Sequence, residues 1–435
     1  MKRRQLLLAG GAGALGGLLA ACGGGEPADV QTLADGREGA LAVGAASAAR
    51  VVIVGGGMAG GTLAKYLRLW SNGTIDVTLV ERDARYTSCI LSSLVLTGQR
   101  TLGSLRFTYD ALRTKYGVKV VTGEVVEVDA AAARVRLADG TSLQGDRLVL
   151  ATGIDFDPVP GLSNPNRMPH AWKAGAQTTL LASQLAAMPS GGTVVMTIPK
   201  VPYRCPPGPY ERACLLADWL KARKPGSKLL VLDANPDFVT EKDNFSRAFF
   251  DLHGGVIEYR TNAEVLSADA ASMTVTTSQG KVHGDVINLI PRQRAPAIIA
   301  GAGLANATEG RFAAVDVLSY ASTAAPLVHV IGDSSATLQP KAGHIANQEA
   351  KVCADALLRI FAGEDPDPAP VTNSACFSTI TMTKASWLEA VFQYDPAART
   401  MVAVPAASGA SDGWNGDYFE DMGKWFRALM ADSLG

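Results

Sequence analysis

A short segment near residue 50 constrains this fold more than any other part of the sequence. A β-branched run at residues 51–54 precedes three glycines in the spacing GxGxxG, namely Gly55, Gly57 and Gly60. In this pattern the first glycine permits a tight turn, the second lets the backbone approach a pyrophosphate, and the third lets a helix pack on a strand. A second strand is expected at residues 75–80, and Glu81 at its end can hold ribose hydroxyls. This order predicts a Rossmann-type dinucleotide site.

Two later strand ends favour FAD over NAD as the dinucleotide. Residues 148–153 end in Ala-Thr-Gly at Gly153, and residues 328–333 end in Gly332 and Asp333. Both resemble elements of the flavin oxidoreductases that have two nucleotide-binding domains. In that family the first element closes the first domain, and the second binds the ribityl chain and pyrophosphate of FAD. The resemblance makes these residues FAD ligands, although Asp333 could also be a surface residue at the end of an ordinary strand.

A second Rossmann unit is expected to begin with a strand at residues 192–198. Where a glycine-rich turn would follow in a protein that uses NADH, residues 199–209 contain five prolines. Proline has no backbone N–H and a fixed φ, so this loop cannot cradle a pyrophosphate. A helix near residues 210–222 and a strand at 228–232 ending in Asp233 continue the unit. We therefore expect an NAD-like domain without its coenzyme site, and electrons that leave by another acceptor.

Length and charge limit the remaining possibilities. The chain has 435 residues, of which 47% are hydrophobic, enough for two or three domains. Forty Lys and Arg against 41 Asp and Glu leave no basic surplus for binding nucleic acid.

The predicted fold class is α/β, with two Rossmann-like domains and a small α+β C-terminal domain. The FAD-binding domain is discontinuous and takes residues 50–160 and 291–363. The NAD-like domain takes 161–290. A linker rich in acids and prolines follows at 364–370, and the C-terminal domain takes 371–435.

The N-terminus has the pattern of an export signal. Arg3 and Arg4 precede a weakly hydrophobic stretch that ends at Cys22, which resembles a twin-arginine signal closed by a lipobox. We expect a signal at residues 1–22, a lipid anchor on Cys22, a flexible tether at 23–49 and a periplasmic location. A short buried or membrane-anchoring helix is the alternative.

Four segments carry a more specific resemblance, and they are residues 86–92, 170–175, 203–212 and 285–291. From residue 50 to the end, the chain resembles the flavoprotein subunit of flavocytochrome c sulfide dehydrogenase. The resemblance implies that sulfide is oxidised at a flavin and that a c-type cytochrome subunit receives the electrons. No CxxCH motif occurs in the sequence, so we expect the haem in a separate subunit.

Cysteine roles follow from this resemblance. Cys89 stands where the family carries FAD through an 8α-thioether bond, although a buried thiol is the alternative reading from the residues alone. Cys205 corresponds to one of two cysteines whose disulfide is attacked by sulfide. Its partner position holds Ser335, and a serine cannot complete the disulfide.

The loss of this second cysteine leaves several alternatives open. Cys205 could act alone, or with Cys214, Cys353 or Cys376, or the protein could use another donor. The sequence patterns of Cys214 and Cys353 favour ordinary core residues. No CxxC pair or Cys/His cluster has zinc spacing, so no structural metal is expected.

Lys341 and His344 lie at the start of the helix that is expected after residue 342. In such folds this helix points its N-terminus at the flavin, and Lys341 and His344 could there stabilise the anionic reduced form. Both could equally be solvated cap residues. His170 and Trp172 match the family, but the sequence alone does not reveal their role.

Three functional hypotheses follow. The first is a lipid-anchored, FAD-dependent dehydrogenase of a sulfur compound that reduces a c-type cytochrome. The second keeps the flavin and the electron exit but has a donor other than sulfide, because Ser335 breaks the disulfide. The third is a non-catalytic flavin-binding assembly protein of a cytochrome or sulfur-oxidation complex.

Overall fold

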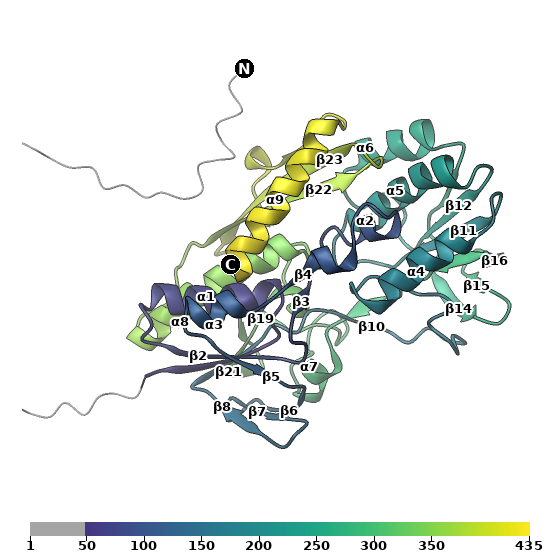
Figure 1. The fold of residues 1–435 in the computed structure, drawn as a ribbon. Helices are drawn as coiled ribbons and strands as arrows, with labels where there is room; N and C mark the ends of the chain where they lie inside the picture. The colour runs from purple at the N-terminus through teal and green to yellow at the C-terminus, as the bar shows by residue number, and fades with distance from the viewer. Residues whose placement is uncertain (1–47) are drawn as a thin grey trace, which may run out of the picture. The chain divides into compact units, whose positions relative to one another are not determined.

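The computed structural model describes residues 48–435, and Figure 1 shows how their helices and strands are arranged. The predicted signal with Cys22, and all but the last two residues of the predicted tether, lie outside the described residues. Within residues 48–435, no helix has the length and apolar character needed to cross a membrane.

The first sheet is built around the strand that precedes the glycine loop. β1 (Arg50–Val54) lies between β2 (Asp76–Glu81) and β9 (Arg147–Leu150), and both pairs are parallel. The sheet order is β19-β20-β21-β9-β1-β2-β5. Its other strands are β5 (Lys119–Thr122), β19 (Val315–Asp316), β20 (Ala321–Ser322) and β21 (Ala325–Val330). Because β21 pairs with β9, one sheet unites the two sequence halves of the predicted discontinuous domain.

Both faces of this sheet are covered, which explains the continuous apolar run in β1. Val51 and Ile53 face a core shared with α1 (Met58–Trp70) and α8 (Gly343–Ala362), which pack together as seen in Figure 1. Val52 and Val54 point to the other face, where β7 (Arg134–Leu137) covers them. Since successive strand side chains point to opposite faces, a strand buried on both sides must be apolar throughout.

The second sheet is parallel and has the order β13-β12-β11-β17. Its strands are β11 (Thr193–Ile198), β12 (Lys228–Asp233), β13 (Ile257–Arg260) and β17 (Val286–Asn288). α5 (Gly208–Arg223) follows the proline loop and α4 (Ala176–Ala187) precedes β11. The helix and strand that we predicted after the proline loop are confirmed.

The C-terminal part is an antiparallel sheet with one long helix. It contains β22 (Val371–Thr379), β23 (Ala385–Asp395), β24 (Thr400–Ala403), β25 (Gly409–Ala410) and α9 (Gly416–Leu434). α9 also packs on α1, where the Lys65 ammonium donates to the Ala431 carbonyl at 3.0 Å. Residues 364–370 have no regular structure, as expected of a linker.

Shorter elements complete the chain. They are β3 (Tyr86–Thr87), α2 (Ser93–Leu96), η2 (Leu102–Leu105), β4 (Arg106–Phe107), α3 (Asp110–Thr114), β6 (Val125–Asp129), β8 (Ser142–Gln144), β10 (Asp155–Phe156), α6 (Lys242–Ser246), η3 (Arg247–Leu252), β14 (Val265–Asp269), β15 (Thr274–Thr277), β16 (Gly280–His283), β18 (Gln293–Arg294), α7 (Ala297–Gly301), η4 (Gly332–Ser334) and η5 (Pro405–Ala407). The predicted class, α/β with two Rossmann-type sheets and a small α+β C-terminal domain, is confirmed.

Candidate functional site

The glycine loop between β1 and α1 has the geometry that its spacing predicts. Gly55 has a φ of +100°, which side-chain-bearing residues rarely adopt, so it can make the tight turn. A Cβ at Gly60 would lie 1.8 Å from the Gly55 carbonyl oxygen, so this position must stay bare for α1 to pack against the turn. Gly57 caps α1, and a Cβ there would meet only the Tyr86 ring, at 3.7 Å. The N-terminus of α1 is therefore open to a phosphate.

Glu81 ends β2 beside this loop, as predicted. Its Oε2 accepts a hydrogen bond from the Gly56 N–H at 2.6 Å, and its Oε1 accepts one from the Asp83 N–H at 3.2 Å. The carboxylate thus joins the end of β2 to the glycine loop, at the edge where an acid holds ribose hydroxyls in dinucleotide folds. Tyr109, which the sequence did not reveal, packs over the loop and donates its hydroxyl to the Gly56 carbonyl at 3.2 Å.

Parallel pairing of β9 and β21 brings Gly153 close to the turn at Gly332 and Asp333. Gly153 and Gly332 both have a φ of +70°, and nothing lies within 4 Å of the place where a Gly153 Cβ would be. The Oδ1 atom of Asp333 is buried and has no hydrogen-bond partner in the described part of the chain. Burial raises the pKa of this carboxyl, and two neighbouring cations oppose the rise.

These features fit a dinucleotide cofactor that carries hydroxyl groups. A buried carboxylate oxygen needs a donor, and the ribityl hydroxyls of FAD are donors. The residues that would hold FAD are Gly55, Gly57, Gly60, Glu81, Gly153, Gly332 and Asp333. When bound, FAD supplies a two-electron acceptor.

Lys341 lies two residues before α8 and brings a cation to this site. Its ammonium donates to the carbonyls of Asp333 at 3.0 Å and of Ser335 at 2.6 Å. It also lies 3.8 Å from the centre of the Phe312 ring. Burial lowers the pKa of Lys341, and the Asp333 carboxyl opposes this. The predicted cation is therefore fixed to the turn that carries Asp333.

His344 lies in the first turn of α8 and connects it to the C-terminal sheet. Its Nδ1 accepts a hydrogen bond from the Ala375 N–H at 3.0 Å. Burial lowers the pKa of His344, so the ring is neutral at pH 7. Of the two residues predicted to bring positive charge to the flavin, Lys341 is thus the better placed, and His344 ties α8 to β22.

Cys205 is held in an unusual conformation by the proline loop. Its φ is +61°, in the left-handed region that costs free energy for a residue with a side chain. Its N–H donates to the Lys341 carbonyl at 2.6 Å, and its own carbonyl accepts from the Gly208 N–H at 2.9 Å. A Cβ on Gly208 would lie 2.8 Å from the Cys205 sulfur and 3.0 Å from the Trp172 ring. The thiol is therefore packed between the start of α5 and Trp172.

Two arginines fix the segment around Trp172, and sequence reasoning assigned no role to either. The Arg204 guanidinium donates to the Trp172 carbonyl, and the Trp172 indole donates to the Arg204 carbonyl at 3.2 Å. The Arg212 guanidinium is buried, lies 4.6 Å from the Trp172 ring centre and donates to the Ala171 carbonyl at 2.9 Å. These contacts supply the role of Trp172 that the sequence left open, which is to form a wall beside Cys205.

Arg204 also brings positive charge to the group of residues predicted from the sequence. Burial disfavours the charged form of this guanidinium, but the Cys89, Asp333 and Tyr86 side chains outweigh that effect and raise its pKa. Cys89 is half-buried in the loop after β3, and its sulfur accepts a hydrogen bond from the Ala174 N–H at 3.4 Å. The structure thus brings Cys89, Cys205 and Asp333 around one arginine.

The remaining cysteines separate into core and site. Cys214 and Cys353 are fully buried in the cores of the second and first domains, as their sequence patterns predicted. Cys376 is half-buried on β22, and its charged form would raise the pKa of Cys205 further, after the larger effects of burial and of Glu211. Of these three cysteines, Cys376 is therefore the one whose charge bears on the pKa of Cys205.

Glu211, in the first turn of α5, is a further residue to which the sequence assigned no role. Burial is the main reason why its pKa rises to about 8, with the Arg212 guanidinium opposing the shift. Glu241 adds to the rise and accepts hydrogen bonds from the hydroxyls of Ser378 at 2.5 Å and Ser386 at 2.8 Å. Glu211 can accordingly exchange a proton near neutral pH beside Cys205.

Family models match most of the described chain. The central part of the sulfide dehydrogenase [flavocytochrome c] flavoprotein chain matches residues 178–291, and the flavin-binding part of flavocytochrome c sulphide dehydrogenase matches residues 368–434. The predicted resemblance to the flavoprotein subunit of flavocytochrome c sulfide dehydrogenase is therefore confirmed. Residues 49–185, which carry the glycine loop, match the pyridine nucleotide-disulphide oxidoreductase family. Together these matches support a FAD-dependent oxidoreductase related to sulfide dehydrogenases.

Curated relatives match only a part of the chain. The probable ferredoxin reductase CtmF of Castellaniella defragrans is 39% identical over 106 residues, which are 24% of this chain and 26% of that protein. The rhodocoxin reductase of Rhodococcus erythropolis is 31% identical over 144 residues, which are 32% of this chain and 33% of that protein. The match thus spans a quarter to a third of each relative.

Solved structures share the whole fold. The sulfide:quinone oxidoreductase of Aquifex aeolicus aligns with a TM-score of 0.72 and 17% identity, covering 89% of this chain and 91% of that one. The NAD-dependent persulfide reductase of A. fulgidus aligns with a TM-score of 0.59 and 15% identity, covering 87% and 77%. At this identity the likeness shows the fold alone.

Proposed function

We propose that this chain is an exported dehydrogenase that oxidises sulfide or a related sulfur compound at FAD and passes the electrons to a c-type cytochrome. The observation that carries the proposal is the position of Cys205. The loop that would bind a nicotinamide coenzyme in the second domain is replaced by a proline-rich loop, and this loop holds a thiol beside the predicted flavin site.

Two charged residues bear on the reactivity of Cys205. Burial and the charge of Glu211 raise the pKa of the Cys205 thiol well above its usual value, and the Arg204 cation partly opposes this rise. Glu211, with a pKa of about 8, can take up a proton that is released when the thiol reacts. A bond between the substrate sulfur and the Cys205 sulfur would form with loss of two electrons, which FAD would accept. Trp172 packs against the thiol on one side.

The electron exit and the location rest on weaker support. The absence of a phosphate loop argues for an acceptor other than NAD, and the family pairs its flavoprotein with a cytochrome. Cys89 would hold FAD covalently, as the resemblance implies. The paired arginines at positions 3 and 4 support export by the twin-arginine route, and Cys22 would carry the lipid anchor.

Ser335 favours a second candidate, in which the donor is not sulfide. Its buried hydroxyl donates to the Gly332 carbonyl at 2.8 Å, and a hydroxyl cannot take part in disulfide exchange. A donor that gives up its electrons without forming a bond to sulfur would need no second cysteine.

Anaerobic titration of the purified flavoprotein with sulfide tests the first candidate, with loss of the oxidised flavin absorbance as the readout. We expect bleaching by sulfide that is lost in Cys205→Ser and kept in the matched core variant Cys214→Ala. Bleaching by sulfide that survives in Cys205→Ser would overturn the role of this thiol. No bleaching by sulfide, polysulfide or thiosulfate would favour the second candidate or the assembly protein, and reduction by other donors separates these two.

A further inference from the structure

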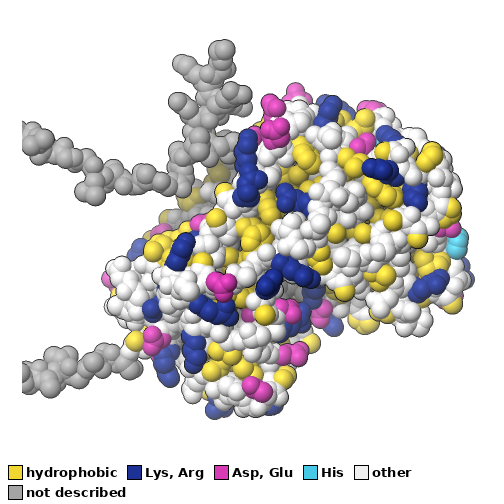
Figure 2. All heavy atoms as spheres, in the orientation of Figure 1, with side chains coloured by type: hydrophobic (Ala, Val, Ile, Leu, Met, Phe, Trp, Pro, Cys, Tyr) yellow, Lys and Arg dark blue, Asp and Glu magenta, His cyan; other side chains and the backbone are white. Residues whose placement is uncertain are grey.

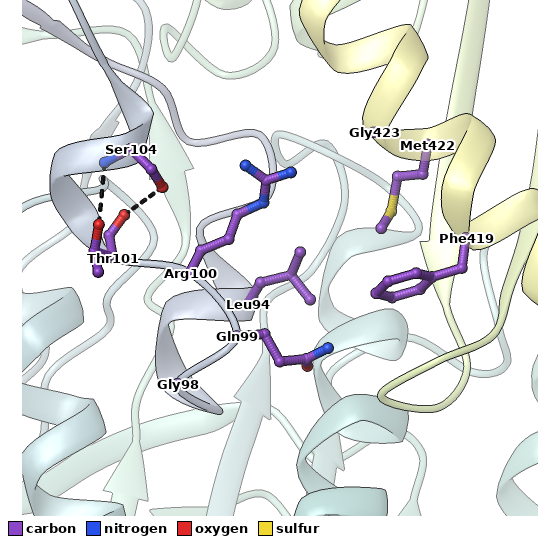
Figure 3. A pocket seen from close by; sticks show the side chains of 9 residues that line it. All are labelled: Leu94, Gly98, Gln99, Arg100, Thr101, Ser104, Phe419, Met422 and Gly423. Atoms are coloured by element: carbon purple, nitrogen blue, oxygen red, sulfur yellow. Dashed lines mark hydrogen bonds between the residues drawn. The ribbon is translucent and has the colours of Figure 1, made fainter.

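A surface pocket of about 460 Å³ lies between the segment 94–104 and α9. Figure 3 shows Leu94 and Arg100 facing Phe419 and Met422 across it. Its volume is within the range of about 300–1,000 Å³ that small-molecule sites occupy. None of the residues that we assign to the flavin or to the sulfur chemistry lines it.

The inner wall of the pocket is apolar. Leu94 and Met422 are buried and pack with Leu215 of α5, while Phe419 is half-buried against them. Three domains thus meet here. Leu94 belongs to the FAD-binding domain, Leu215 lies on α5 of the NAD-like domain, and Met422 lies on α9 of the C-terminal domain. Domain junctions are common places for ligand sites. On this face of the molecule, Figure 2 shows hydrophobic atoms gathered along α9 with Lys and Arg side chains beside them.

One guanidinium group lines the pocket, that of Arg100, and a second, that of Arg427, lies beside it. Arg100 lies 5.6 Å from the Phe426 ring centre, and its pKa is lowered by burial and by the charge of Arg427. An Nη atom of Arg427 lies 3.7 Å from the place where a Cβ on Gly423 would be, so this guanidinium folds back over a residue that lines the pocket. Two like charges at one pocket repel each other unless an anion lies between them.

No acid in the described part of the chain compensates these two cations. Neither arginine has a carboxylate within salt-bridge distance among residues 48–435. Asp421, on the same turn of α9, pairs with Lys424 at 2.8 Å. The amide of Gln99 donates to the Met382 carbonyl at 2.6 Å, so it is already satisfied. Among residues 48–435, the guanidiniums of Arg100, which lines the pocket, and of Arg427 beside it are thus left without a carboxylate partner.

We infer that this pocket binds a small organic anion, with its carboxylate or sulfonate between Arg100 and Arg427 and its apolar body against Leu94, Phe419 and Met422. The guanidinium geometry suits a planar oxyanion, and the apolar wall excludes a bare inorganic ion as the best occupant. The inference concerns binding alone and holds whichever donor and acceptor the flavin uses.

Calorimetric titration of the full chain with octanoate tests this, with octanol and octylammonium as probes of the same length. We expect one saturable octanoate site, binding at least about tenfold weaker for octanol, and none for octylammonium. Arg100→Gln and Arg427→Gln should each weaken octanoate binding by about tenfold, whereas Arg113→Gln, an exposed arginine on α3, should not. Equal affinity for octanoate and octanol would overturn the inference.

A second pair of variants separates binding from folding. Gly423→Leu places a side chain in the pocket without a backbone clash, since only Arg427 lies near its Cβ position, and should abolish octanoate binding while the melting temperature is kept. Ala428→Leu, on an exposed position of the same helix, should bind normally. Anionic phosphatidylglycerol vesicles serve as a further probe, and binding to them without any binding of octanoate would show a membrane-contact surface and contradict the small-anion site.

Discussion

The backbone N–H of Cys205 donates to the carbonyl oxygen of Lys341 at 2.6 Å. This bond joins the proline loop of the second domain to the turn of the first domain that carries the predicted flavin ligand Asp333. Because Lys341 also donates its ammonium to the Asp333 and Ser335 carbonyls, the thiol and the flavin site share one support. A substitution on either side of this contact should therefore affect both the Cys205 thiol and the predicted flavin site.

Gly208→Ala tests the packing of the Cys205 thiol. The added Cβ would lie 2.8 Å from the sulfur, so the thiol must move, and we expect a loss of about 1–3 kcal/mol in the free energy of unfolding with slower flavin reduction. Urea unfolding and stopped-flow reduction measure the two effects. Gly301→Ala, where nothing lies within 4 Å of the Cβ position, is the matched control and should change neither. A normal rate of flavin reduction in the Gly208→Ala variant would show that the position of the Cys205 sulfur does not matter for the reaction.

Gly57→Ala and Gly60→Ala should have different effects: the first should reduce flavin content, and the second should reduce stability. At Gly60 the Cβ would lie 1.8 Å from a backbone oxygen, so we expect a loss of about 3 kcal/mol or more even without cofactor. At Gly57 the added Cβ would make only an ordinary contact with the Tyr86 ring, at 3.7 Å, and would occupy space that a pyrophosphate needs, so the apoprotein should keep its stability and lose flavin content. Thermal melting of apoprotein and flavin absorbance per chain distinguish the two. Full flavin content in Gly57→Ala would contradict the assigned role.

Cys89→Ala tests the covalent link to FAD. Flavin should stay with wild-type protein after acid precipitation and go into the supernatant with the variant, because a thioether survives acid and a non-covalent site does not. Cys376→Ala, another half-buried cysteine, should behave as wild type. Release of flavin from wild-type protein would show that the link is absent.

Glu211→Gln tests the carboxyl beside Cys205 through pH. A glutamate ionises near pH 4.5 when unfolded, and burial raises the pKa of Glu211 to about 8 in the folded chain. Between these values the folded state binds the proton and the unfolded state does not, so the free energy of unfolding falls as pH rises from about 5 to about 8. The variant should show a flatter slope in urea unfolding at pH 5, 6.5 and 8. The exposed control Glu258→Gln should keep the wild-type slope, and an unchanged slope in Glu211→Gln would contradict the raised pKa.

Local patterns predicted much of this molecule, and tertiary contacts account for what they missed. The glycine spacing predicted the roles of Gly55 and Gly60 because these depend on one turn. The role of Arg204 depends on segments that are distant in sequence, since its guanidinium donates to the Trp172 carbonyl and its backbone N–H donates to Gln293 Oε1 at 2.8 Å. Hydrophobic periodicity and local motifs cannot predict contacts between segments that are so far apart in the sequence.

The cysteines show the same limit. The core positions of Cys214 and Cys353 followed from apolar helix patterns, which are local. The effect of the Cys376 charge on the pKa of Cys205 depends on the packing of β22 on α5, and the sequence could do no more than name Cys376 among three alternatives. A signal did exist, since the segments 170–175 and 203–212 matched the family closely and contain most of the residues that surround the thiol.

The return of β21 to the first sheet has a consequence for how the protein is made. Asp333 and the strand that carries it emerge from the ribosome only after the whole second domain has been synthesised. A nascent chain that stops before β21 lacks one wall of the cofactor cradle, however well its glycine loop has formed. Flavin loading must consequently be a late event in the life of the polypeptide.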